Sequence, residues 1–169
     1  MAPYEDRTVT LERVRIIFRN FAGKEGKYNR EGDRNFAVLL DDDVAESMAA
    51  GGWNVKSLKS REEGEPEQPY LTVSVGFKGR PPRIVMITSQ GRTSLSEDEC
   101  EVLDWIDIEW VDLVIRPYEW VVRDQTGIKA YLKTIFVKVH EDPLELKYAD
   151  LDELPARAGR IDEGDGEEG

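Results

Sequence analysis

The sequence predicts a mainly β domain in which about six strands and two short helices form a small barrel. Three observations support this fold class. Residues 110–122 and 128–139 are long runs rich in β-branched and aromatic residues, with a short polar turn between them. Residues 71–77 alternate between apolar and small or polar side chains, as in a half-buried strand. In residues 8–18 the apolar positions change parity midway, which indicates a β-bulge in a strand that curls around a barrel.

Length and composition indicate one globular domain followed by an acidic tail. A chain of 169 residues, 40% of them hydrophobic, can bury a core of its own. We expect residues 1–154 to form this domain. Residues 155–169 are acidic and rich in glycine, with no apolar pattern that could offset the loss of chain entropy, so we expect a disordered, flexible tail.

We expect a cytoplasmic protein without a membrane partner. No apolar run approaches the roughly 20 residues that span a bilayer. The N-terminus also lacks the apolar segment of a secretory signal. The single cysteine, Cys100, excludes an intrachain disulfide framework and suits a reducing compartment.

Residues suited to a metal centre are scarce. One histidine and one cysteine cannot form a zinc site of the usual Cys/His type, so only carboxylates remain as metal ligands. The three aspartates at 41–43 precede a short apolar stretch, where helix capping explains them more simply. We therefore expect no metal and no cofactor.

The runs 110–122 and 128–139 are predicted to form an antiparallel hairpin, and strand parity then sorts their side chains by face. One face is apolar and contains Val111, Leu113, Ile115, Val121, Ile128, Ala130, Leu132 and Phe136. The other contains Arg116, Tyr118, Trp120, Lys129, Tyr131 and Lys133. We predict a four-residue turn at 124–127, which places Trp120 opposite Tyr131. Tyr118 then lies opposite Lys133. A five-residue turn would instead place Trp120 opposite Ala130.

The polar face of this hairpin interleaves aromatic rings with cations, a composition that suits a site for single-stranded nucleic acid. Bases stack on aromatic rings at roughly 1–3 kcal/mol each, and the cations follow the phosphates. The alternative is structural, because Tyr118, Trp120 and Tyr131 could simply cover a second hydrophobic layer, as aromatic residues in strands often do.

Two other segments add cations and rings. Arg13, Arg15 and Arg19 are predicted to share the outer face of the curled first strand. The stretch 19–34 holds three glycines, five cations and three acids, and its candidate contacts are Phe21, Lys24, Lys27, Tyr28 and Arg30. A loop this long in a compact domain is usually functional or mobile. It could equally be a solvated hairpin loop with incidental rings.

The remaining elements are short. We predict strands at 35–40, 53–59 and 84–87, a helix at 44–50 that two glycines end, and an edge strand at 144–148. Ser96 and Glu99 have the spacing of a capping box, so a helix should follow as far as about Asp104. This inventory fits an OB-fold, a Greek-key barrel that binds oligonucleotides across one sheet face and its flanking loops. Arg13, Arg15, the 19–34 loop and the hairpin would converge there.

Five stretches between residues 18 and 132 carry a family resemblance. They are FRNF at 18–21, NREGDRNFAV at 29–38, GWNVK at 52–56, IRPY at 115–118 and GIKAYL at 127–132. They resemble bacteriophage single-stranded DNA-binding proteins of the OB-fold type, and the resemblance covers most of residues 10–140. It implies a non-catalytic protein that coats DNA strands during phage replication and recombination in the host cytoplasm. It also implies an acidic C-terminal tail that recruits replication proteins and competes with DNA for a basic groove.

The distribution of charge is compatible with this resemblance. The net charge is −12, but residues 141–169 hold 11 acidic and three basic residues, so the first 140 residues carry a net charge of only −4. The acids of the predicted partner-binding tail are Asp162, Glu163, Asp165, Glu167 and Glu168. The sequence ends in Gly169, without the terminal aromatic residue of many relatives, so partner binding is less strongly implied than strand binding. A monomer and a homodimer both fit the sequence.

Two other functions compete with this one. The triplet Glu145-Leu146-Lys147 mimics the acid-x-Lys strand of a metal-dependent nuclease, but no second acidic strand end supports two-metal chemistry. The acidity of the whole chain favours a protein-binding or virion-structural β-domain without a nucleic-acid role.

Overall fold

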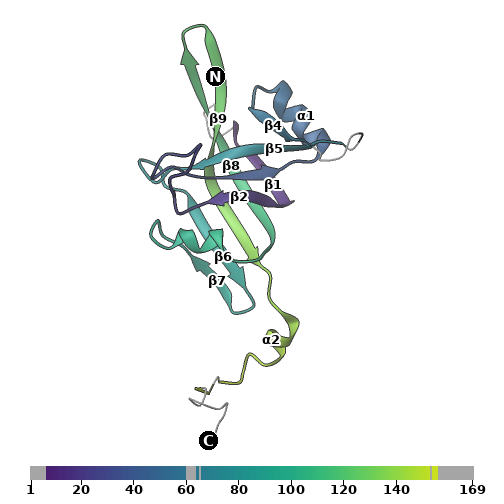
Figure 1. The fold of residues 1–169 in the computed structure, drawn as a ribbon, viewed down its shortest axis with the longest axis vertical. Coiled ribbons are helices and arrows are strands. Elements are labelled where there is room, and N and C mark those ends of the chain that lie inside the picture. Colours follow the sequence, from purple (N-terminus) through teal and green to yellow (C-terminus); the bar gives the residue numbers. More distant parts are fainter. Residues whose placement is uncertain (1–6, 60–63, 65, 153, 156–169) are drawn as a thin grey trace, which may run out of the picture.

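The chain is built around one strongly curved sheet (Figure 1). The computed structural model describes residues 7–59, 64, 66–152 and 154–155. In chain order, the elements within them are β1 (Val9–Val14), β2 (Ile16–Asn20), β3 (Arg34–Leu39), α1 (Asp42–Ala50), β4 (Val55–Leu58), β5 (Gln68–Val75), β6 (Arg83–Thr88), β7 (Gly91–Ser94), the 3₁₀ helix η2 (Cys100–Asp104), β8 (Ile108–Val122), β9 (Gln125–Val139) and α2 (Pro143–Lys147). The predicted mainly β fold class is confirmed.

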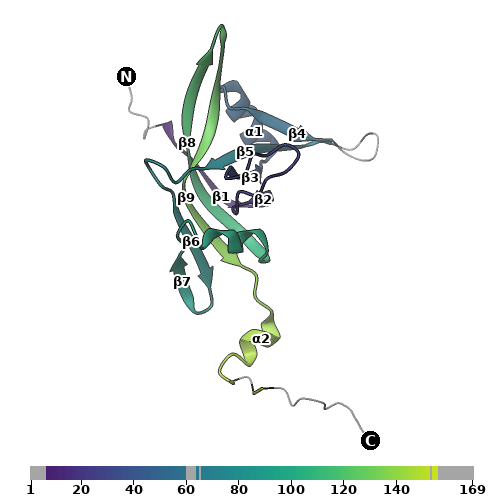
Figure 2. The same cartoon turned by 60° about the vertical axis from the view of Figure 1, so that its left-hand side comes forward.

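The strand order is that of a partly open OB-like barrel. The main path runs β1-β8-β9-β5-β3-β2, while β4 pairs with β5, and β6 pairs with β9 and β7. β9 runs parallel to both β5 and β6, and the other pairs are antiparallel. The two ends of the path, β1 and β2, follow each other in the chain, so the sheet bends round on itself (Figure 2). Within the described residues no ladder joins β1 to β2, so the barrel is not closed.

The parity change predicted within residues 8–18 is confirmed. A single residue, Arg15, separates β1 from β2, and the pairing of β1 with β8 shifts register within β1. Arg13 and Phe18 have positive φ angles of 55° and 52°, which are uncommon for residues other than glycine. The backbone N–H of Arg13 donates to Asp112 Oδ1 at 2.7 Å, which ties the irregularity to β8. The curled strand can therefore contribute to both edges of the sheet.

The predicted hairpin is confirmed, but the predicted register is wrong. A two-residue turn, Arg123-Asp124, joins β8 to β9. Arg123 adopts the positive φ, 57°, that such a tight turn needs, so no glycine is required in the turn. Gly127, expected as the last turn residue, instead lies in β9 opposite Trp120. Trp120 therefore lies opposite neither Tyr131 nor Ala130.

A bulge changes the parity of β9. The ladder with β8 skips Lys133, which is the extra residue of the bulge. The buried positions shift by one after it, so Ile135 and Val137 are buried. Phe136, predicted on the apolar face, lies half-buried on the opposite face, with the Arg83 guanidinium 5.6 Å from its ring centroid.

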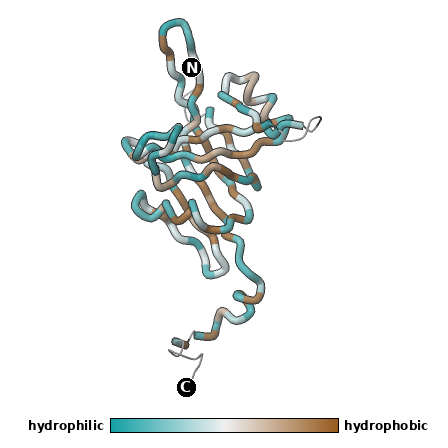
Figure 3. The backbone as a smooth tube through the Cα atoms, in the orientation of Figure 1, coloured by the Kyte–Doolittle hydropathy of each residue, from teal (hydrophilic) through white to brown (hydrophobic). Residues whose placement is uncertain are grey.

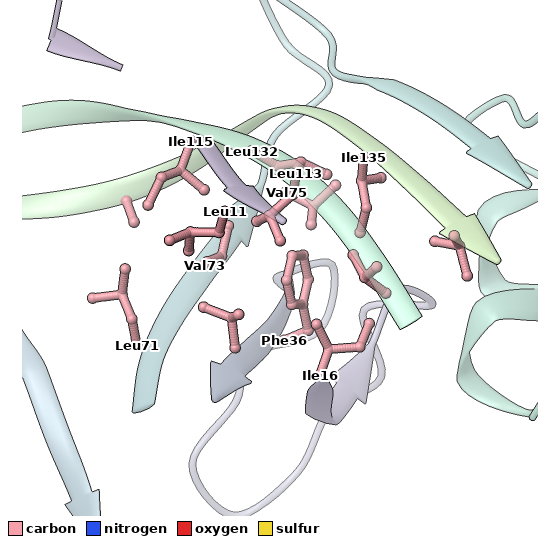
Figure 4. Packing of buried hydrophobic residues seen from close by; sticks show 14 of the residues in the cluster. Leu11, Ile16, Phe36, Leu71, Val73, Val75, Leu113, Ile115, Leu132 and Ile135 are labelled. Atoms are coloured by element: carbon pink, nitrogen blue, oxygen red, sulfur yellow. The ribbon is translucent and has the colours of Figure 1, made fainter. Parts of the chain in front are cut away.

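The core lies inside the curved sheet, where the apolar faces of the strands meet (Figures 3 and 4). Its buried residues come from every strand of the main path and include Leu11, Ile16, Phe36, Val73, Leu113, Leu132 and Ile135. Helix α1 adds Ala45 and Met48. The tip of the β8–β9 hairpin extends beyond this core, so Val121 is exposed, contrary to the prediction.

Two helices follow their sequence signals in part. α1 begins after Asp41 and carries Asp42 and Asp43 in its first turn, although the Asp41 side chain makes no capping hydrogen bond. The helix predicted after Ser96 is the short 3₁₀ helix η2, and the Ser96 N–H donates to Glu99 Oε1 at 2.9 Å, as in a capping box. Hydrogen bonds from the backbone and the hydroxyl of Ser96 hold the pKa of Glu99 below its ordinary value.

The prediction of an edge strand at 144–148 is wrong, because helix α2 covers Pro143–Lys147. The Asp142 side chain accepts a hydrogen bond from the Leu144 N–H at 2.7 Å, and Pro143 supplies the fixed φ that suits a first helical turn. No helix among the described residues is long and apolar enough to cross a membrane. The tail acids Asp162, Glu163, Asp165, Glu167 and Glu168 lie outside the described residues.

Candidate nucleic-acid interface

The outer face of the sheet is hollowed where β5 and β9 run parallel. Val73 pairs with Ala130 and Ser74 with Tyr131, which brings the middle of β5 beside the polar face of the hairpin. One hollow of about 240 Å³ lies at the Trp120 end of this seam, and a second of about 690 Å³ lies towards the 24–33 loop. Ser74 and Lys129 line both hollows. We therefore treat them as one feature, the β5–β9 groove.

The groove combines rings and cations. The first hollow is lined by Asn54, Lys56, Leu71, Thr72, Ser74, Trp120, Ile128, Lys129 and Ala130. The second is lined by Tyr28, Asn29, Gly32, Asp33, Arg34, Asn35, Ser74, Val75, Gly76, Phe77, Lys78, Glu97, Lys129 and Tyr131. These linings contain four cations, Arg34, Lys56, Lys78 and Lys129, and two carboxylates, Asp33 and Glu97. The groove is therefore positively charged, although the chain as a whole is acidic.

Trp120 is held in place by the glycine opposite it. A Cβ atom on Gly127 would lie 2.4 Å from Trp120 Cζ2, so the indole ring lies directly against the backbone of β9. Trp120 is still 37% exposed. One side of the indole ring is therefore held against β9. The exposed part of the ring can contact a base without the side chain having to be ordered first.

Two tyrosines stand beside Trp120 on the same face. Tyr118 lies opposite Lys129 instead of Lys133, and Tyr131 lies opposite Arg116. The Tyr118 and Tyr131 rings meet edge to face, 6.0 Å apart at an angle of 80°. Lys129 Nζ lies 5.3 Å from the centroid of Tyr131, close enough for a cation–π contact. The predicted sharing of one face by rings and cations is thus confirmed even though the register differs.

The 24–33 loop is organised by Asn29. Its side-chain amide donates to the carbonyl oxygens of Lys24, Arg30 and Asp33, at 2.8, 3.0 and 3.0 Å. Next to it, Tyr28 is 91% exposed and has Lys27 Nζ 5.4 Å from its centroid. The loop therefore presents the exposed Tyr28 ring, with Lys27 beside it, at the mouth of the groove.

Arg34 joins the groove to the core. Its Nη1 lies 3.0 Å from Glu97 Oε2, and its guanidinium lies 5.5 Å from the Phe77 centroid. Behind it, Cys100 Sγ donates to the carbonyl oxygens of Glu97, at 3.3 Å, and Phe21, at 3.5 Å. Burial raises the pKa of the Cys100 thiol. This cysteine therefore remains a neutral packing residue.

The arginines of the curled strand do not converge on the groove. Arg19 Nη1 donates to the carbonyl oxygens of Leu103 and Ile106, at 2.8 and 2.7 Å, so it anchors η2. The Arg13 guanidinium lies 3.8 Å from the Trp110 ring centroid. Arg15, Arg19 and Trp110 line another hollow, of about 350 Å³, which shares no lining residue with the groove.

The other candidate residues are scattered. Phe21 is fully buried and stacks on Phe36 at 5.2 Å, so its ring belongs to the core. Lys133 is partly buried in the bulge, and Arg116 donates to the Arg80 carbonyl oxygen at 3.2 Å.

Sequence reasoning missed several residues of the groove, namely Arg34, Asn54, Lys56, Thr72, Ser74, Phe77 and Lys78. The basic composition of 78–83 is a signal that could have found Lys78. Lys56 and Ser74 have no such signal, because only the pairing of β5 with β4 and β9 brings them beside Trp120 and Lys129.

Solved structures with a similar fold include three of a protein from bacteriophage Enc34. The single-stranded DNA-binding protein of bacteriophage Enc34 in complex with ssDNA is 14% identical, with a TM-score of 0.54 over 82% of this chain and 90% of that chain. Its C-terminal truncation is 15% identical, with a TM-score of 0.53 over 82% and 89%. The Enc34 protein alone is also 15% identical, with a TM-score of 0.52 over 94% and 88%. These likenesses confirm the OB-like fold.

The sequence itself matches a family. None of the curated proteins compared with the chain matches it significantly. The family model of the phage ssDNA-binding domain, however, matches residues 3–168, which is nearly the whole chain. The chain therefore belongs to the family of phage single-stranded DNA-binding domains.

Proposed function

We propose that this protein binds single-stranded DNA without catalysis and with little sequence preference, and that the strand lies in the β5–β9 groove. Membership of the phage family supports the function, and the Enc34 protein of similar fold has been solved in complex with ssDNA. The placement of the strand is our own inference from the geometry of the groove.

One observation carries this placement: rings and cations line two hollows that share Ser74 and Lys129. Trp120 and Tyr131 lie in different hollows that share Lys129, and Tyr28 lies at the far end. Stacking tolerates any base because every base has a π-face, and lysines track phosphates regardless of sequence. The arrangement therefore suits a strand of mixed sequence.

Substitution of the rings tests the placement. Trp120→Ala and Tyr131→Ala should each weaken binding of a poly-pyrimidine oligonucleotide by roughly 1–3 kcal/mol, with the melting temperature little changed. Trp105→Ala is the matched control, because Trp105 is 62% exposed and lines neither hollow. If the two groove variants bind as tightly as Trp105→Ala does, the groove is not the binding site; if they also unfold the domain, both rings belong to the core.

The absence of catalysis needs its own test. Glu145-Leu146-Lys147, the triplet considered for a nuclease, lies in α2 and not on a strand. Mg²⁺ should leave a labelled oligonucleotide intact in the presence of the protein. Cleavage that Glu145→Ala abolishes would overturn a non-catalytic role.

We further propose that the protein serves phage DNA replication and recombination in the host cytoplasm. The domain would span residues 1–154, and the acids of the 155–169 tail would recruit replication proteins and compete with DNA. Family membership and the acidity of the C-terminal residues support this role. Affinity capture of replication proteins by the full chain, and its loss on deletion of 156–169, would test recruitment.

A further inference from the structure

Phe18 is an exposed ring in a strained backbone conformation. Its φ is 52°, and the residue is 61% exposed. A bulky residue in this region of φ costs free energy, and an exposed ring recovers little of it by burial. Burial in the unbound protein therefore offsets little of this cost.

The Phe18 ring meets a second ring across β3. It packs against Tyr70 of β5, with centroids 5.9 Å apart and planes at 79°. Between β2 and β5, Ala37 of β3 pairs with Ile17 on one side and Thr72 on the other. Because Ala37 carries only a methyl group, the two rings can meet above this strand.

The aromatic pair lies on the same face of the sheet as the β5–β9 groove. Alternate residues of a strand share a face, so Tyr70 points the same way as Thr72 and Ser74, which line the groove. Tyr70 also pairs with Lys56 of β4, another lining residue. The pair thus continues the groove by about 7 Å beyond Thr72, the repeat of two residues along a strand.

We infer that Phe18 and Tyr70 form a further stacking site for a base of the bound strand. The inference rests on the proposed function, because it extends the same path. An edge-to-face pair leaves a ring face open, and a base on that face would cover the exposed ring. Lys56 pairs with Tyr70 and also lines the Trp120 hollow, so it can meet the phosphate that links a base on this pair to a base on Trp120.

The test changes the ring while keeping the backbone. Phe18→Asn removes the ring, and asparagine tolerates positive φ, so the fold should persist. Phe18→Trp keeps an aromatic ring. We expect the asparagine variant of the full-length protein to bind a poly-pyrimidine oligonucleotide about 5-fold or more weaker at an unchanged melting temperature, and the tryptophan variant to bind as the wild type does. An oligonucleotide carrying 5-iodouracil should also crosslink to the peptides that contain Phe18 or Tyr70.

Trp120→Ala separates failure of this inference from failure of the proposed site. If Phe18→Asn binds as the wild type does while Trp120→Ala binds more weakly, the groove stands and the Phe18 site is wrong. If neither Phe18→Asn nor Trp120→Ala lowers the affinity, both the Phe18 site and the proposed groove are wrong. Equal weakening of Phe18→Asn and Phe18→Trp would show that the position acts on the fold, which would overturn stacking.

Discussion

At the scale of single residues, the groove depends on a glycine that makes room for a tryptophan. Gly127 is required because of its neighbour, since a Cβ atom there would lie 2.4 Å from Trp120 Cζ2 and 2.9 Å from Nε1. Such close contacts force the indole to move. Gly127, the first residue of the stretch GIKAYL, thus positions the Trp120 ring, whereas the composition of 124–127 indicated that it ends a turn.

Gly127→Ala should therefore weaken DNA binding through Trp120. We expect a loss of about 1 kcal/mol or more in the wild-type background, and almost none in Trp120→Ala, because the displaced ring is then already absent. A double-mutant cycle of oligonucleotide affinities measures this coupling. Gly51→Ala is the control, since the nearest atom to an added Cβ there is 3.5 Å away. Additive losses in the cycle would contradict the role of Gly127.

At the scale of elements, most strands and the β8–β9 hairpin were predictable, whereas the turn, the bulge and the other strand pairings were not. Apolar and polar residues alternate in 71–77, and β8 and β9 are long runs rich in β-branched and aromatic residues. Such patterns identify strands because burial of one face makes every second residue apolar. The two-residue turn could not be foreseen, because Arg123 adopts a φ that composition assigns to glycine. The bulge at Lys133 depends on packing against β8, which no local signal records.

The candidate site was predictable only where it lies on one hairpin. Trp120, Tyr118 and Tyr131 share a face by parity alone, so the sequence suffices for them. The parallel pairing of β5 with β9 joins residues 57 positions apart, such as Val73 and Ala130, and only the tertiary fold sets it. Phe21 was predicted to contact the nucleic acid but is buried, because a ring in a polar loop can still turn inward and fill the core.

The hydrogen bonds from Ser96 to Glu99 before η2 should make the stability of the fold depend on pH. The pKa of Glu99 is lowered from 4.5, so the folded state favours the carboxylate. The stabilisation is thus present above pH 4.5 and is lost as the pH falls through the lowered pKa of the folded state. Glu99→Gln should lower the melting temperature at pH 7, and the difference from the wild type should vanish in acid.

Melting curves between pH 3 and pH 8 check this expectation. Glu101→Gln, an exposed substitution on η2, is the matched control. A Glu99→Gln difference that stays constant down to the lowest pH would show that its hydrogen bonds from Ser96 do not depend on the charge of the carboxylate.

At the scale of the whole molecule, charge is divided between the groove and the C-terminal residues. Lys56, Lys78 and Lys129 are exposed cations in the groove, while the chain carries −12 overall. If each lysine neutralises one phosphate, log K should fall with log salt concentration with a slope of about −2. The C-terminal acids would compete with phosphates most strongly at low salt.

Deletion of residues 156–169 should consequently tighten DNA binding at low salt and have little effect at high salt. The deleted segment holds five acidic and two basic residues. A full-length variant with these acids replaced by their amides should behave like the deletion, because charge and not chain length is responsible. Salt titrations of oligonucleotide affinity measure both variants. Unchanged or weaker binding at low salt would rule out competition.

The central claim, that a strand lies across Trp120 in a cationic groove, is tested most directly by fluorescence. Of the four tryptophans, Trp53, Trp105 and Trp110 can be replaced by phenylalanine, which leaves Trp120 as the only indole reporter. Titration with a poly-pyrimidine oligonucleotide should quench its emission, and added salt should restore it. Binding of the oligonucleotide with no change in Trp120 emission would contradict the claim.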